Sequence, residues 1–115
     1  MAETQLGAAL ARAKARLDRL DYYPEPVRTE RVRILVAPWF FRIPGFRRYH
    51  AYAFWRTILL KSRDASDDLV THELCHIWQG QQRPVHMSFK HVTTRYSSNP
   101  YELEARRSVT ETRAS

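Results

Sequence analysis

Residues 72–76, His-Glu-Leu-Cys-His, combine side chains that bind metals with a carboxylate beside them. In an α-helix, side chains four positions apart lie on one face, so His72 and His76 can bind the same ion. Neutral imidazole nitrogens suit a borderline-soft ion such as Zn²⁺. Glu73 lies one position along, where its carboxylate can take a proton from an activated water instead of binding the metal. The pattern therefore predicts a zinc site for hydrolysis, with Glu73 as general base.

Two histidines do not complete such a site, so a third ligand must follow His76 in the chain. Four downstream side chains are candidates for this role: His86, His91, Glu102 and Glu104. In a metzincin the third histidine would lie six residues after His76, and Gln82 occupies that position. The metzincin class is therefore excluded.

Residues 99–105, Asn-Pro-Tyr-Glu-Leu-Glu-Ala, contain a Glu-x-x-Ala pattern that resembles the glutamate helix of gluzincins. Together with residues 72–79, this segment makes the chain similar to minigluzincins, which are minimal gluzincins, and to small bacterial HExxH proteins that share the block. The resemblance is specific over residues 70–79 and 96–105 and loose elsewhere. It implies that His72, His76 and Glu102 bind Zn²⁺, that Glu73 is the general base, and that a peptide or protein is the substrate.

The glutamate segment departs from the gluzincin pattern at one position and has a second interpretation. Many gluzincins carry Asp or Asn just after the Glu-x-x-Ala block, where it orients a ligand histidine, and this chain has Arg106 there. Either another acid, such as Glu104, orients the histidine, or the site is tuned differently. Asn99-x-x-Glu102 is also a capping box, in which the carboxylate returns to the cap backbone. The upstream HExxH sequence, which needs a third ligand, favours metal binding.

His91 supports a rival interpretation. Fourteen residues separate it from His76, a spacing similar to that of SprT-like proteases, which use three histidines and act on proteins crosslinked to DNA. The charge would suit such a partner: residues 1–66 contain 13 Lys or Arg against 6 Asp or Glu, whereas residues 67–115 contain 6 of each. The basic half predicts affinity for nucleic acid or an acidic partner, unless it is only a solvated surface. Aromatic and arginine side chains over residues 39–55 allow the same two interpretations.

Composition limits the remaining options. The 115 residues support a single domain, 1–115, and no apolar run approaches the length of a membrane span. The N-terminus lacks the order of a signal peptide, and a single cysteine favours the reducing cytoplasm. With only one cysteine, the chain cannot build a zinc site from cysteines. This residue, Cys75, is either a soft extra ligand or a buried thiol. A non-catalytic zinc domain, or a latent peptidase whose tail after Arg107 fills the cleft, remains an alternative function.

The sequence predicts helices and strands around these residues that together form an α+β, zincin-like fold. Apolar residues at steps of three and four predict a helix over 3–20, and residues 31–36 and 55–61 are strand candidates of a small twisted sheet. We expect a loop or short hairpin at 39–50, and the second strand along the cleft edge, where a peptide could pair with it. The HExxH helix should begin after Ser66 and stop at Gly80. A connecting helix over 85–96 and a glutamate helix over 100–110, capped by Asn99, complete the fold.

Overall fold

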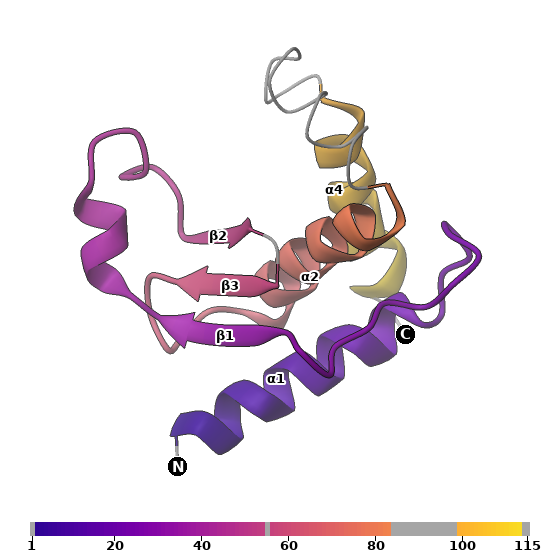
Figure 1. Cartoon of the computed structure of the whole chain (residues 1–115), viewed down its shortest axis with the longest axis horizontal. Helices are drawn as coiled ribbons and strands as arrows, with labels where there is room; N and C mark the ends of the chain where they lie inside the picture. Colours follow the sequence, from indigo (N-terminus) through magenta and orange to yellow (C-terminus); the bar gives the residue numbers. More distant parts are fainter. Residues whose placement is uncertain (1, 55, 84–98, 114–115) are drawn as a thin grey trace.

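The computed structural model describes residues 2–54, 56–83 and 99–113. This part of the chain is an α+β fold with three α-helices and a three-stranded mixed sheet (Figure 1). Its elements are α1 (Ala2–Leu17), β1 (Arg33–Val36), the 3₁₀ helix η1 (Pro38–Arg42), β2 (Ala51–Phe54), β3 (Thr57–Leu60), α2 (Asp67–Gln82) and α4 (Pro100–Arg113). The connecting helix predicted at 85–96 lies outside the described residues.

The sheet has the strand order β1-β3-β2, so β3 is the central strand. It pairs in parallel with β1 and antiparallel with β2, with Ile58 opposite Ile34 on one side and Ala53 on the other. Burial of Ile58, Leu59 and Leu60 explains why this strand reads as a continuous apolar run.

Two predictions about the sheet need correction. The strand predicted at 55–61 does not lie at the cleft edge, because β3 is paired on both sides and the edge strand beside the cleft is β2, whose Ala51 lines it. Residues 38–42 form η1, and β2 begins only at Ala51, beyond the predicted loop or hairpin at 39–50. The alternation of alanine with an aromatic residue in 51–54 was the available strand signal.

Helix α2 begins as the sequence predicts and ends later. The Ser66 hydroxyl accepts a hydrogen bond from the Leu69 N–H (3.1 Å), which confirms the N-cap. The predicted stop at Gly80 is wrong, because the helix continues to Gln82. A glycine ends a helix by adopting positive φ, and among the described glycines only Gly45 does so. The extra residues keep Gln79 inside regular helical geometry.

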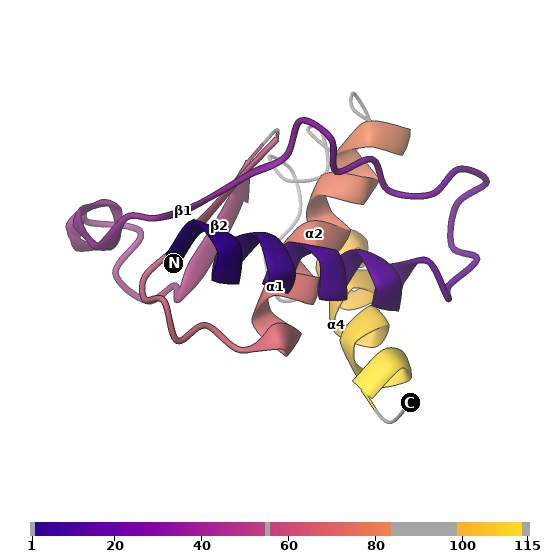
Figure 2. The same ribbon diagram turned by 90° about the horizontal axis from the view of Figure 1, so that it is seen from below.

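The core lies where α2 packs against the sheet, α1 and α4 (Figures 1 and 2). The predicted apolar back of α2 is buried: Val70, Leu74, Ile77 and Trp78. The Trp78 indole N–H donates to the Glu25 carbonyl (2.8 Å), which ties the chain after α1 to this helix. With its apolar side fixed in this way, α2 turns its histidines toward α4.

Helix α4 begins with the predicted cap. The Asn99 side-chain oxygen accepts a hydrogen bond from the Tyr101 N–H (2.8 Å), and Pro100 takes the first helical position. The buried Ala105 and Val109 pack this helix onto the rest of the molecule. The cap and the packing together place Glu102, in the first turn, against α2.

An acidic residue joins the three helices. Asp68 of α2 accepts hydrogen bonds from Arg16 of α1 (2.9 Å) and from Arg113 of α4 (2.9 Å). Arg12 of α1 pairs in the same way with both carboxylate oxygens of Asp67 (3.0 and 3.1 Å). Two arginines of the basic half therefore serve internal contacts. No helix in the described ranges is long and apolar enough to cross a bilayer.

Candidate metal centre

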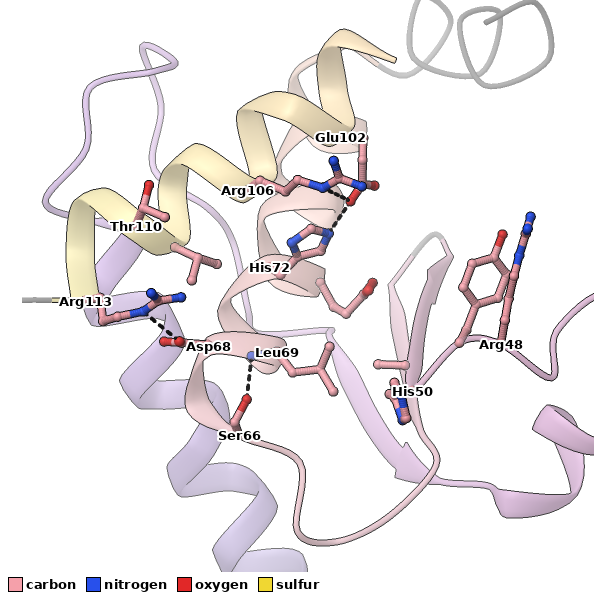
Figure 3. Close-up of a pocket in the computed structure, with 14 residues that line it drawn as sticks. Arg48, His50, Ser66, Asp68, Leu69, His72, Glu102, Arg106, Thr110 and Arg113 are labelled. Carbon is pink, nitrogen blue, oxygen red and sulfur yellow. Dashed lines mark hydrogen bonds and ion pairs between the residues drawn. The ribbon is translucent and has the colours of Figure 1, made fainter. Parts of the chain in front are cut away.

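The three side chains that the resemblance selects meet in the structure. His72 and His76 project from α2 toward Glu102 of α4. The His72 Nε2 lies 2.7 Å from one Glu102 carboxylate oxygen, and the His76 Nε2 lies 3.0 Å from the other. Potential ligand atoms of all three residues lie within 4.8 Å of one another, and Figure 3 shows His72 and Glu102 beside the cleft. They form a cluster able to bind a metal ion.

Glu102 is held as an anion in this cluster. Its side chain is only 1% exposed, and burial by itself would raise its pKa. The hydrogen bonds and charge of His72 and His76 outweigh burial and hold the pKa of Glu102 far below its usual range. Each carboxylate oxygen faces a different imidazole, so the carboxylate points to the cluster, as a ligand must.

Gln79 determines which nitrogen of His76 faces the cluster. The Gln79 amide nitrogen donates to the Tyr101 carbonyl (2.8 Å) and to a Glu104 carboxylate oxygen (3.0 Å). Both partners only accept, so the amide oxygen must be the atom that lies 2.8 Å from the His76 Nδ1. His76 therefore carries a proton on Nδ1, and its Nε2 faces Glu102. This is the tautomer that a metal-binding histidine requires.

Glu104 contributes to the orientation of His76 indirectly. One of its oxygens accepts from both Gln79 and the Tyr23 hydroxyl (2.6 Å), which anchors the chain His76–Gln79–Glu104–Tyr23. The acid behind His76 is thus Glu104, which acts through Gln79. Gln79 itself was missed, although its position three residues after His76 puts both on one helix face.

The protonation of His76 supports the fit to a cation. Its two nitrogens face acceptors on Gln79 and Glu102, and this arrangement favours the doubly protonated imidazolium. Burial opposes that charge, but the Glu102 hydrogen bond and the nearby Glu73 charge raise the pKa of His76 above its usual value. A metal ion bound to Nε2 in place of the proton would be stabilised by the same negative charges of Glu102 and Glu73. The two-His, one-Glu donor set is that of three-ligand zinc sites in hydrolases.

Glu73 lies beside the ligands without joining them. Its side chain is buried and lines the same cleft as His72 and Glu102. Burial raises the pKa of Glu73 above its usual value, although the two histidines and a backbone hydrogen bond from Ala53 of β2 oppose this. A carboxylate with a raised pKa is a stronger base. The role of Glu73 in proton transfer stays a prediction.

A cleft of about 870 Å³ opens beside the cluster. One wall is α4, another is the first half of α2, and the third is the segment that leads into β2 (Figure 3). Arg106 lies on the α4 wall, with its Nε 3.5 Å from Glu102. Val109, Thr110 and Arg113, in the last turns of α4, line the same wall. The ligand cluster is therefore accessible from one side, where an ion could keep an exchangeable position.

The other candidate ligands are not found at the cluster in the described part of the chain. Cys75 is a fully buried thiol in the core, and burial raises its pKa to about 12. Within the described ranges, His72, His76 and Glu102 are the one group of three or more potential ligands. His86 and His91 lie outside those ranges.

The comparisons identify no relative. The chain matches no protein-family model, no curated protein and no solved structure. The description of the metal centre therefore depends on the geometry of the cluster.

Proposed function

We propose that this protein is a zinc-dependent metallopeptidase of the kind that minigluzincins exemplify. The observation that carries the proposal is the meeting of His72, His76 and Glu102 at an open cleft, with Glu73 beside them. Three protein ligands and one accessible side are typical of catalytic zinc, whereas structural zinc usually has four protein ligands.

The donor set favours zinc over harder cations. Magnesium and calcium prefer oxygen ligands, whereas two imidazoles and a carboxylate suit Zn²⁺. Zinc, when bound, supplies a Lewis acid that polarises a carbonyl and lowers the pKa of water. His72, His76 and Glu102 would hold the ion, while Gln79 keeps the His76 Nε2 turned toward it.

Glu73 performs the proton transfers in this proposal. Its carboxylate accepts a proton from the water that attacks the peptide carbonyl, and it delivers that proton to the amine nitrogen as the C–N bond breaks. Glu73 lines the cleft together with Ala51 of β2. The outer edge of β2 then becomes the place for an extended peptide to pair, in place of the strand first expected.

A peptidase assay on the zinc-loaded protein tests the proposal. We expect cleavage of an unstructured protein substrate such as casein, with the rate reduced at least about a hundredfold in Glu73→Gln. The substitution keeps the shape of the side chain and removes its basicity, and zinc content should remain one per chain. Equal cleavage by Glu73→Gln would contradict the general-base role. A zinc-loaded wild type without activity toward any peptide would favour the non-catalytic zinc domain.

We also propose that the basic half binds an anionic partner, a nucleic acid, beside the η1 segment. A hollow of about 620 Å³ there is lined by Arg42, Arg47 and Lys61 together with Pro38 and Phe41, and its described lining contains no acid. Three cations suit a phosphate backbone. Binding of single-stranded DNA should weaken with salt, and neutralising Arg42, Arg47 and Lys61 together should abolish it. Binding unchanged in that triple variant would refute this surface.

A further inference from the structure

The segment that runs from β1 to the end of β3 is strongly basic. Residues 31–61 contain seven Lys or Arg and no Asp or Glu. Three of these cations, Arg42, Arg47 and Lys61, are exposed and line the hollow beside η1. The residue before η1 donates a backbone hydrogen bond to the last residue of β3 (2.9 Å), so η1 starts next to Lys61. The hollow therefore lies at the end of the sheet away from α4 (Figure 1).

Acids of the described part of the chain do not neutralise these three cations. None of the ion pairs between described residues includes Arg42, Arg47 or Lys61. Arg47 donates from its Nε to the Arg42 carbonyl (3.4 Å), which leaves the two outer nitrogens of its guanidinium for a ligand. By contrast, Arg12 and Arg16 of the same basic half are held by acids of α2. The positive charge of the hollow is therefore available to an anion.

An exposed tryptophan lies on the same 3₁₀ helix. Trp39 is 65% exposed, the highest value among the large apolar side chains of the described residues. Side chains three positions apart are eclipsed in a 3₁₀ helix, so Trp39 shares a face of η1 with Arg42. Its one ring contact in the described ranges is with Phe40, at 6.2 Å between ring centroids and with the ring planes at 83°. A flat face of the indole is therefore open beside the hollow.

Cations around a hollow next to an open flat ring suit a single strand of nucleic acid. The phosphates bind the cations, and an unpaired base stacks on the ring. In a duplex each base is already stacked between its neighbours, so it has no free face for an indole. A lipid bilayer is also anionic and accepts tryptophan at its surface, but it is flat and cannot follow cations into a hollow.

We propose that Trp39 is the base-stacking residue of this surface, which therefore selects single-stranded nucleic acid over duplex. The inference rests on the nucleic-acid surface proposed above and names the form of its ligand. Arg42, Arg47 and Lys61 contact the phosphates, while Trp39 stacks on one base beside them. Stacking accepts every base, because each base has a flat face, so the surface binds without strong sequence preference.

Fluorescence anisotropy with a labelled oligothymidine strand of about twelve nucleotides tests the proposal. Trp39→Ala should weaken binding about tenfold or more, the loss expected for one stacked base. Trp39→Phe keeps an aromatic face and should stay within about threefold of the wild type. The same strand paired with its complement should bind the wild type more weakly, and it should lose nothing in Trp39→Ala. Circular dichroism checks that each variant is folded.

Phe54→Ala is the matched control. Phe54 is also an exposed aromatic residue, at 56%, but in the sheet it lies opposite Thr57, at the other end of β3 from Lys61. This variant should bind the single strand as the wild type does. Equal losses in Trp39→Ala and Phe54→Ala would overturn the role of Trp39. Single strand and duplex bound equally by the wild type would overturn the proposed selectivity.

The outcomes separate this inference from the surface on which it rests. Wild-type affinity in Trp39→Ala, together with loss of binding when Arg42, Arg47 and Lys61 are neutralised, contradicts stacking and leaves the phosphate-binding surface standing. A wild type that does not bind the strand at low salt contradicts both. Binding to vesicles of phosphatidylserine and phosphatidylcholine through Trp39, without binding of the strand, would overturn the inference and make a membrane surface the partner.

Discussion

At the residue scale, the hydrogen bond between Gln79 and His76 determines which imidazole nitrogen of His76 faces the cluster. It fixes the imidazole tautomer, and the Gln79 amide is in turn fixed by Tyr101 and Glu104. His72, His76 and their partner Glu102 could be predicted because their types and spacing match a known pattern. Gln79 could not, because its role depends on which groups α4 brings next to it.

Gln79→Leu should therefore weaken zinc binding while His72, His76 and Glu102 stay in place. Leucine cannot accept a hydrogen bond from the Nδ1–H of His76, so this imidazole loses its fixed tautomer. The affinity for zinc should therefore fall about 10- to 100-fold. Competition with a chromophoric chelator measures the change. Gln82→Leu, three residues further along α2, is the control and should bind zinc as the wild type does. Unchanged affinity in Gln79→Leu would refute the orienting role.

Cys75 should behave as an inert core thiol. It is fully buried, and burial raises its pKa to about 12, so almost no thiolate forms at pH 8. We expect the folded protein to react with an aromatic disulfide reagent at least about a hundredfold more slowly than the protein in guanidinium. Fast labelling of the native state would show that the site is more open than the structure describes. Zinc should not alter the rate, since Cys75 is not a ligand.

At the element scale, the capping residues and the apolar back of α2 were predictable because they are local patterns. The Ser66 and Asn99 caps and the Pro100 start are confirmed. The path of the sheet was not predictable, because strand order depends on contacts between distant segments. That is why β2 was missed and β3 was placed at the edge.

The Asn99 cap should matter more than the Ser66 cap. Asn99 is 1% exposed and holds the turn that carries Glu102, whereas Ser66 is exposed. Asn99→Ala should lower the free energy of unfolding by about 1–2 kcal/mol and weaken zinc binding, and Ser66→Ala should cost about 0.5–1 kcal/mol with zinc affinity unchanged. Urea unfolding in a chelator gives the first quantity, and zinc competition gives the second. Equal effects of the two variants on zinc affinity would contradict this view of α4.

At the scale of the whole molecule, folding redistributes the charge that the sequence separates. The excess of +7 lies in residues 1–66, yet Arg12 and Arg16 pair with Asp67 and Asp68 of the second part. The basic surface available to a partner is therefore smaller than the sequence suggests. It includes the cations near η1, whereas the cleft cations belong to α4 and the segment before β2.

Asp68 should make the stability of the helix assembly depend on pH. Partial burial raises its pKa, but hydrogen bonds and charge from Arg16 and Arg113 outweigh this and lower it below 3.8. A lowered pKa means that the stabilisation is present above pH 4 and is lost as pH falls through the folded-state value. Asp68→Asn should cost about 1 kcal/mol or less at pH 7 and less than that near pH 2.5. Urea unfolding in a chelator at both values tests this; a difference independent of pH would contradict it.

Zinc stoichiometry and affinity test the central claim most directly. Calorimetry and elemental analysis of the wild type should give one Zn²⁺ per chain, and Glu102→Ala should lose that binding by at least about a hundredfold while remaining folded. His91→Ala, which removes the third ligand of the SprT-like alternative, should bind zinc as the wild type does. Wild-type affinity in Glu102→Ala, or loss of zinc from His91→Ala alone, would contradict the His72–His76–Glu102 centre.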